Sequence, residues 1–236
     1  MSRLGRSIMA TAAIAALAVS TAAFAEEPKP EFDQKLENAT AVYQELLNTP
    51  DRGVPEALLS KCKCVTVIPH AVKGAMVYGA RMGTGVMSCR NEKGAWSPPS
   101  FIRLAGGSFG PQIGAETSDL VLFFMTERGA RSLMTSSKIT LGGQAGVAAG
   151  PIGRSVEIGT DLKLDAEIYT YAKSKGLFAG AALTGARLSA DKKANQKFYG
   201  SGVTLNQLIF DHNAPRLPDS ARQFMNALTA AAQAQN

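Results

Sequence analysis

The chain has 236 residues, with 25 lysines and arginines against 19 aspartates and glutamates, and a formal net charge of +6. This length suits one domain, and the mild positive charge is compatible with anionic partners. Aromatic residues make up 7% of the chain and do not alternate with basic ones, so we expect no nucleic-acid partner.

The first 25 residues have the pattern of a secretory signal peptide. Arg3 and Arg6 precede an apolar stretch over 8–19, and Ala23-Phe24-Ala25 has the small-x-small form of a cleavage site. The stretch is shorter than the ~20 residues that span a bilayer, although an uncleaved interfacial anchor stays an alternative. We expect cleavage after Ala25, a periplasmic or secreted location, and one domain over 26–236. The mature chain would keep 23 basic and 19 acidic residues, a net charge of +4.

An amphipathic helix is predicted over 31–48, because its apolar residues recur at spacings of three and four. The opposite face is acidic and amidic, and Lys35 is its single basic residue. That charge pattern does not suit an anionic membrane, so we expect this helix to pack on the domain. A short helix with Pro55 in its first turn should follow.

A strand is predicted over 64–68, ending at Pro69. Beyond it the chain becomes rich in glycine: all 23 glycines except Gly5 and Gly53 lie between Gly74 and Gly202. Here we expect strands over 75–82 and 86–90 around a Gly83-Thr84-Gly85 turn, a buried strand over 118–125, a helical turn over 127–134, and a hairpin formed by 168–172 and 177–187.

The fold class that follows is α+β. Glycines inside strands mark bends and close backbone approaches, which predicts a curved, Gly-rich antiparallel sheet or partly closed barrel. Helices should flank it at both ends, over 31–48 and over 204–232, with a frayed C-terminal tail. Helical spacing also occurs over 194–198, and Asp219 and Ser220 are cap candidates for the last helix.

Motifs for catalysis are weak. Ser108 lies in a Gly-x-Ser-x-Gly pattern, but Pro111 is a poor helix start and His212 is the only histidine downstream. The Gly-rich stretch over 142–154 lacks the lysine of a phosphate-binding loop. The carboxylates Asp161, Asp165 and Glu167 alternate with apolar residues, as on the solvated face of a strand. We therefore expect no enzyme and no cofactor.

Three cysteines, Cys62, Cys64 and Cys89, are present. In an oxidising compartment two of them should form a disulfide, although three reduced, buried thiols are an alternative. Cys62 and Cys64 point to the same face of a strand, so either could reach Cys89. A zinc site would need about four ligands, and with two histidines in the chain we expect no metal.

Basic side chains fall singly at predicted loop edges and strand ends. If a subset converges on one face, it forms an anion-binding patch in which each cation near a membrane contributes ~1 kcal/mol. The candidates are Lys73, Arg81, Arg103, Arg154, Lys173, Lys175 and Arg187.

Several short segments, in order, resemble the SYLF lipid-binding domain family. They are Lys73-Gly74-Ala75, Gly83 to Arg90, Gly94 to Pro99, Gly110 to Gly114, Asp119-Leu120-Val121, Leu141-Gly142, Ala149 to Arg154, Tyr169-Thr170-Tyr171, Lys175 to Gly180, and Asn195 to Gly200. Where many relatives have Ser-Leu-Glu-Gly, this chain has Ala182-Leu183-Thr184-Gly185 and lacks the carboxylate.

The resemblance implies binding rather than catalysis. The expected function is a non-catalytic module that recognises anionic phospholipid or membrane surfaces in the bacterial envelope. A protein-interaction or scaffold module with an envelope-protein partner is the alternative. Relatives often carry cysteines at the positions of Cys64 and Cys89, so the resemblance also implies that these two form the disulfide and leave Cys62 free or paired between molecules.

Overall fold

The computed structural model describes residues 31–49, 53–75, 79–108, 114–135, 138–143, 145–151 and 166–233. The predicted signal peptide and Arg154 lie outside these ranges. The helices are α1 (Glu31–Asn48), α2 (Glu56–Lys61), α3 (Glu127–Thr135), α4 (Lys192–Tyr199), α5 (Leu205–Ile209) and α6 (Asp219–Gln233). The strands are β1 (Cys64–Ala75), β2 (Gly79–Cys89), β3 (Ser100–Ser108), β4 (Gly114–Phe124), β5 (Lys138–Thr140), β6 (Val147–Ala149), β7 (Ile168–Ser174), β8 (Leu177–Gly180) and β9 (Arg187–Ala190).

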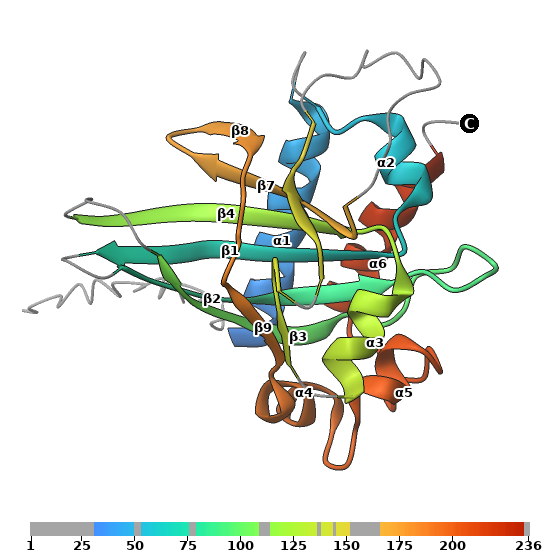
Figure 1. Ribbon diagram of the computed structural model, residues 1–236. Helices are drawn as coiled ribbons and strands as arrows, with labels where there is room; N and C mark the ends of the chain where they lie inside the picture. Colours follow the sequence, from blue (N-terminus) through green and yellow to red (C-terminus); the bar gives the residue numbers. More distant parts are fainter. Residues whose placement is uncertain are drawn as a thin grey trace, which may run out of the picture.

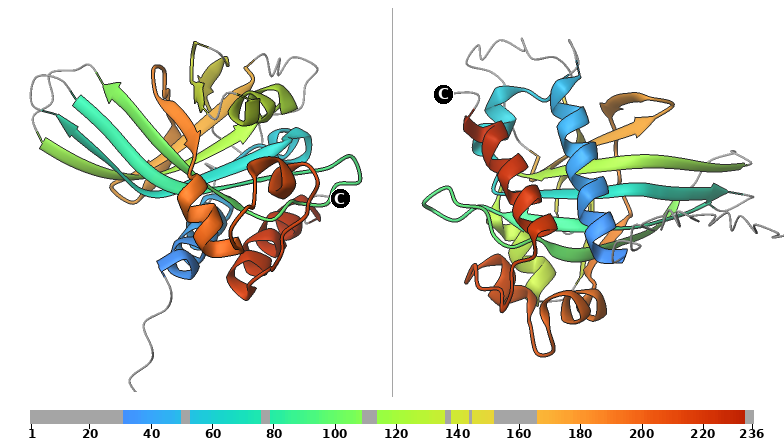
Figure 2. Two further views of the ribbon diagram at one scale, coloured as in Figure 1. Left: turned by 90° about the horizontal axis from the view of Figure 1, so that it is seen from below. Right: turned by 180° about the vertical axis from the view of Figure 1, so that it is seen from behind.

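The described strands form one sheet in the order β5-β9-β3-β2-β1-β4-β7-β6, and β8 pairs with β7. The sheet curls into a half-barrel, with α1 and α6 side by side against its outer face (Figures 1 and 2). This confirms the α+β prediction of a curved sheet flanked by terminal helices. One correction is that β6 and β7 are parallel, so the sheet is mixed rather than fully antiparallel.

Helix α1 covers the range predicted from its periodicity and packs through its apolar face, as expected. Leu36, Tyr43 and Leu46 are almost fully buried against the sheet and α6. The Tyr43 ring lies 6.5 Å from the ring of Phe123, measured between centroids, and Phe123 meets Tyr171 of β7 at 5.7 Å. Burial of these aromatic side chains fixes α1 across the strands. None of the described helices is both long and apolar enough to cross a membrane.

The predicted turn at Gly83-Thr84-Gly85 is wrong, because these residues lie inside the continuous strand β2. A Cβ atom at Gly85 would approach the Val67 carbonyl oxygen to 2.1 Å, and one at Gly83 would approach Ile68 Cγ2 to 2.6 Å. The glycines therefore allow β1 and β2 to come close together rather than reversing the chain.

Two predicted strand limits are also corrected. β1 does not stop at Pro69 but continues to Ala75 through a register shift between Ile68 and Ala71. The predicted strand 177–187 ends at Gly180, and β9 starts separately at Arg187. The hairpin itself is confirmed, since Lys175 and Gly176 have φ of 53° and 83°, the left-handed geometry of a two-residue turn.

The helical C-terminal region is interrupted between α5 and α6, where Pro215 and Pro218 occur. Ser220 lies within α6 and donates a hydrogen bond from its hydroxyl to the Asp33 carboxylate of α1. The prediction that Ser220 caps α6 is therefore corrected. Its hydroxyl joins the two terminal helices instead.

Cys64 and Cys89 are directly opposite in the β1–β2 register and form a disulfide, as the family resemblance implied. Cys62 is a buried free thiol whose Sγ donates to the Leu59 carbonyl at 3.2 Å. Burial raises the pKa of Cys62 to about 11, so the thiol stays protonated and is a poor nucleophile for disulfide exchange.

Candidate functional site

A register shift in β1 divides the long strands into two parts. Pro69 has no N–H to give to a neighbouring strand, and His70 adopts a φ of 52°. The backbone N–H of His70 bonds instead to Asp119 Oδ1 at 2.9 Å. We use "projecting end" for the sheet beyond this shift, namely residues 71–75, 79–84, 104–108 and 114–118, together with the β7–β8 turn. It extends away from α1 and α6 in Figure 1 and in the two further views of Figure 2.

Exposed apolar side chains gather at the projecting end. Val72 is 45% exposed, Met82 63% and Leu177 59%, and these are the large apolar side chains that stand out as exposed in the described part of the chain. Val72 of β1 faces Met82 of β2 directly, while Leu177 follows the β7–β8 turn. Exposed apolar surface concentrated in one place is typical of an interaction site.

A groove of about 790 Å³ runs between the first half of α1 and the outer face of the projecting end. Val72, Met82 and Ala105 form its apolar floor. Lys35 of α1 and Arg103 of β3 add positive charge to its lining. Pockets of this size hold small molecules.

Two of the predicted cations lie on the opposite, inner face of the projecting end. Lys73 and Arg81 face each other across β1 and β2, and Glu116 of β4 faces Lys73 from the other side. Burial lowers the pKa of Arg81 and Glu116 partly offsets this effect. The Arg81 Nε atom is buried without a hydrogen-bond partner in the described structure. Arg81 is thus a half-buried cation with an unpartnered Nε that a bound anion could stabilise.

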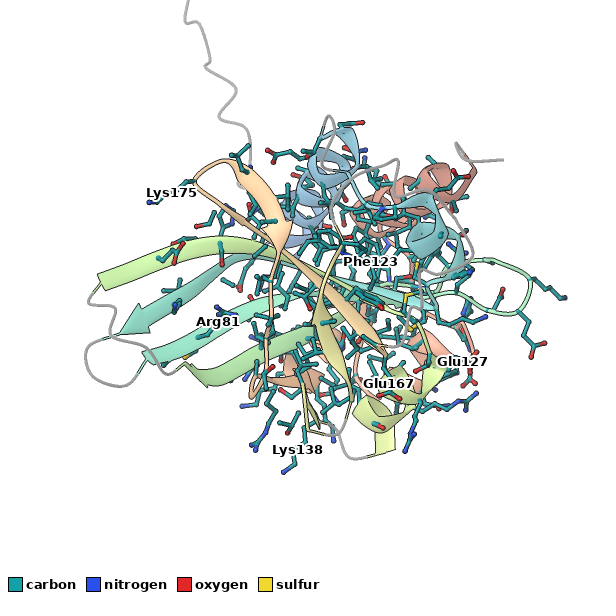
Figure 3. The ribbon with its side chains drawn as sticks, turned by 45° about the horizontal axis from the view of Figure 1, so that its top comes forward. Arg81, Phe123, Glu127, Lys138, Glu167 and Lys175 are labelled. Carbon is teal, nitrogen blue, oxygen red and sulfur yellow. A yellow bond between two sulfur atoms is a disulfide. The ribbon has the colours of Figure 1, made fainter. Side chains whose placement is uncertain are left out.

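The remaining predicted cations do not form one cluster. Lys175 lies exposed in the β7–β8 turn, at the same end of the molecule as Arg81 (Figure 3). Lys173 forms an ion pair with Glu45 of α1 at 2.6 Å. Arg187 is on β9, opposite Ala105 of β3. Arg154 lies outside the described residues. The other predicted cations are divided between the projecting end, the face covered by α1 and the β9 side of the sheet.

Arg103 is held by Asp191, the residue that caps α4. Its Nε and Nη2 atoms donate to Asp191 at 2.7 and 3.0 Å, and Asp191 also accepts from the Ala194 N–H at 3.1 Å. Burial would raise the pKa of Asp191, but these hydrogen bonds and the charges of Arg103 and Lys35 outweigh it and hold the pKa below its ordinary value. Lys35 is therefore close enough to Asp191 to act on it electrostatically.

Val72, Met82 and Lys35 were not predicted as site residues from the sequence. Lys35 was assigned to a solvated helix face, and the alternation of a strand cannot show which of its ends a helix leaves uncovered. The available signal was Pro69, because a proline within a strand run indicates a bulge or an edge.

The catalytic alternatives gain no support. Ser108 ends β3, and residues 109–113, which would form the turn of a nucleophile elbow, lie outside the described ranges. A Cβ at Gly106 would approach the Ala186 Cα to 2.7 Å, so close packing accounts for this glycine. Glu167 accepts from the Gly146 N–H at 3.1 Å and lies 4.0 Å from Arg128, which is a structural role. Cys64 and Cys89 are bonded to each other and are not available as metal ligands.

Comparison with known proteins places these features in a family context. A profile of the Ysc84 family, described as "Las17-binding protein actin regulator", matches residues 105–231. "SH3 domain-containing YSC84-like protein 1" of Rattus norvegicus is 36% identical over 183 residues, which are 77% of this chain and 54% of that protein. The Homo sapiens protein of the same name is 34% identical over 183 residues, covering 77% and 53%.

"Protein YSC84" of Saccharomyces cerevisiae is 35% identical over 161 residues, which are 67% of this chain and 34% of that protein. The chain thus spans about half or less of the length of the curated relatives it matches. The description of the family names binding and actin regulation rather than an enzymatic reaction. Because the profile match covers more than half of the chain and agrees with the similarity to these relatives, the chain belongs to the Ysc84 family, also called the SYLF domain family.

Proposed function

We propose that this protein is a non-catalytic module that binds anionic phospholipid membrane surfaces of the bacterial envelope. The observation that carries the proposal is the gathering of Val72, Met82 and Leu177 at the projecting end, which also carries Lys73 and Arg81 on its inner face and Lys175 in the β7–β8 turn. Exposed apolar side chains enter the headgroup region of a bilayer, while nearby cations bind the anionic headgroups.

The free energy of membrane binding should be a sum of small contributions from the side chains of this surface. Each cation near an anionic membrane contributes ~1 kcal/mol, and each methylene that enters the acyl region contributes ~0.8 kcal/mol. Binding should therefore depend on the lipid charge and weaken as salt screens the cations. We propose that the module acts after export, following cleavage after Ala25, in the periplasm or outside the cell.

Vesicle flotation tests the proposal with a variant in which a cation and an apolar side chain of the β7–β8 turn are both replaced by glutamate. We expect the double variant Lys175→Glu and Leu177→Glu to weaken binding to phosphatidylglycerol-containing vesicles by roughly tenfold or more. The control is Lys93→Glu, an exposed cation in the β2–β3 turn at the other end of the same sheet. Equal binding of the wild-type protein to neutral and anionic vesicles, or binding to neither, would overturn the proposal.

A second candidate function is an envelope protein-interaction or scaffold module without lipid specificity. The descriptions of the relatives favour it, since they name a Las17-binding protein and proteins that contain an SH3 domain. Such a module would bind an envelope protein saturably in the absence of lipid, and this binding would survive high salt, unlike electrostatic lipid binding.

A further inference from the structure

We propose that the groove between α1 and the projecting end binds one long-chain fatty acid, with its hydrocarbon chain on the apolar floor and its carboxylate at Lys35 and Arg103. This inference rests on the proposed function, because both assume that the protein binds lipids. It extends that function from contact with a membrane surface to the binding of a single lipid molecule. Val72 and Met82 belong to both the groove and the proposed membrane surface, whereas Lys175 and Leu177 do not line the groove, so changes at the β7–β8 turn act on membrane contact alone.

The floor of the groove explains the choice of a hydrocarbon chain. Val72 and Met82 are a directly opposed pair on β1 and β2, and Ala105 of β3 is opposite Met82 on its other side. All three side chains share the outer face of the sheet and form an apolar strip across three strands. Burying each methylene of a ligand on this strip contributes ~0.8 kcal/mol, which a polar ligand cannot obtain there.

The cations explain the acidic end of the ligand. The bidentate bond to Asp191 uses Nε and Nη2 of Arg103 and leaves Nη1 without a hydrogen bond to any described residue. Lys35 donates no hydrogen bond within the described structure, although its charge lowers the pKa of Asp191. The charged side chains that line the groove are Glu31, Lys35 and Arg103, whose net charge of +1 is balanced by one carboxylate, while Asp191 holds Arg103 from outside the lining. Glu31, also in the lining, is exposed and one helical turn away from Lys35.

The dimensions favour a small amphiphile over a protein partner. A groove of about 790 Å³ lies within the range of ~300–1,000 Å³ typical of small-molecule sites. A stable protein interface covers ~800 Å² on each partner, which is far more than a strip of a few side chains beside one half of a helix. Helix α1 forms one wall of the groove with polar side chains of its first half, while its apolar face stays packed on the sheet and α6. The groove therefore offers an apolar floor and a polar wall, which suits an amphiphilic ligand.

A fluorescence titration with cis-parinaric acid, a fatty acid that becomes emissive in an apolar site, tests the inference on the full chain below the micellar concentration. We expect saturable binding to the wild-type protein and displacement by palmitate. Met82→Glu should weaken the affinity at least about tenfold by placing a carboxylate on the floor, and Lys35→Gln should weaken it by roughly threefold to tenfold.

The matched control is Leu177→Glu, an equally exposed apolar residue outside the groove, which should leave the affinity for the fatty acid unchanged. Thermal melting verifies folding of each variant, since Met82 is a surface position. No fatty-acid binding by a protein that still binds vesicles would overturn the groove assignment alone. Fatty-acid binding without vesicle binding would overturn the proposed surface function alone. A wild-type dimer that Met82→Glu dissociates, with no fatty-acid binding, would show that a second copy occupies the groove and would overturn the inference.

Discussion

The same strands form two regions of opposite character on either side of the register shift in β1. Under α1, the central strands bury Val65, Val67 and Phe123 completely. Beyond the shift, β1 and β2 expose Val72 and Met82 by 45% and 63%. The hydrogen-bond ladder continues through both regions, so backbone pairing does not account for the difference.

The difference arises from what covers the outer face. Helix α1 crosses the strands once, from Phe32, whose ring lies 5.2 Å from that of Phe101 on β3, to Glu45, which pairs with Lys173 on β7. Strands that extend beyond this helix have no layer to pack on. A sheet of this kind is stable in its covered part and open to partners in its projecting end.

The largest expected effect separates the two regions directly. Phe123→Ala removes a fully buried ring between Tyr43 and Tyr171, and we expect a loss of about 3–5 kcal/mol in the free energy of unfolding. Met82→Ala at the projecting end should change it by less than about 0.5 kcal/mol. Urea denaturation of both variants measures the contrast, and similar losses at the two positions would contradict the division.

The disulfide lies in the covered part and should have the next largest effect. It closes a sequence separation of 25 residues, so replacing Cys64 and Cys89 by alanine should lower stability by about 3 kcal/mol, mostly through greater freedom of the unfolded chain. Cys62→Ala is the control and should retain the bond. Peptide mapping without reduction verifies the pairing, and a Cys62–Cys89 link in the wild-type protein would contradict it.

Local sequence patterns predicted the covered part better than the projecting end. The periodicity of 31–48 and the apolar run 118–125 led to α1 and to the buried half of β4, because each pattern reflects contact with the core. The Gly83-Thr84-Gly85 segment, at the border between the two regions, was interpreted as a turn because the sequence does not show that β1 passes within 2.1 Å of a Cβ position at Gly85. Close approach between two strands is a tertiary property.

The candidate site was predictable only in part, for a similar reason. Lys73, Arg81 and Lys175 were named from the sequence and lie at the projecting end. Arg103 and Lys173 were named on the same grounds, yet each has a carboxylate partner from a segment more than 80 residues away. Single basic residues look alike in a sequence, and their partners depend on long-range packing.

Glycine substitutions sharpen the comparison at a smaller scale. Gly85→Ala should cost about 1–3 kcal/mol, because the new methyl group would collide with the Val67 carbonyl oxygen, which cannot move without shifting β1. Gly74→Ala at the projecting end meets no atom within 4 Å and should leave stability unchanged or slightly higher. Thermal melting of the two single variants measures the contrast, and a neutral Gly85→Ala would argue against the close approach of β1 and β2.

The smallest expected effect concerns Asp191, which links the groove to the covered part. Because the folded-state pKa of Asp191 is depressed, its charge stabilises the fold at pH values above its unfolded-state pKa of ~3.9. This contribution is lost as the pH falls through the folded-state pKa.

Asp191→Asn keeps a capping oxygen for the Ala194 N–H but removes the charge that holds Arg103. We expect a loss of about 1 kcal/mol at pH 7 that starts to shrink below pH ~3.9 and is gone once the pH lies below the folded-state pKa of Asp191. Urea denaturation across this pH range measures it, with Asp219→Asn as the control, since that 92% exposed side chain forms a surface pair of little energetic value. A loss for Asp191→Asn that stays constant with pH would show that shape, and not charge, is what Asp191 contributes beside the groove.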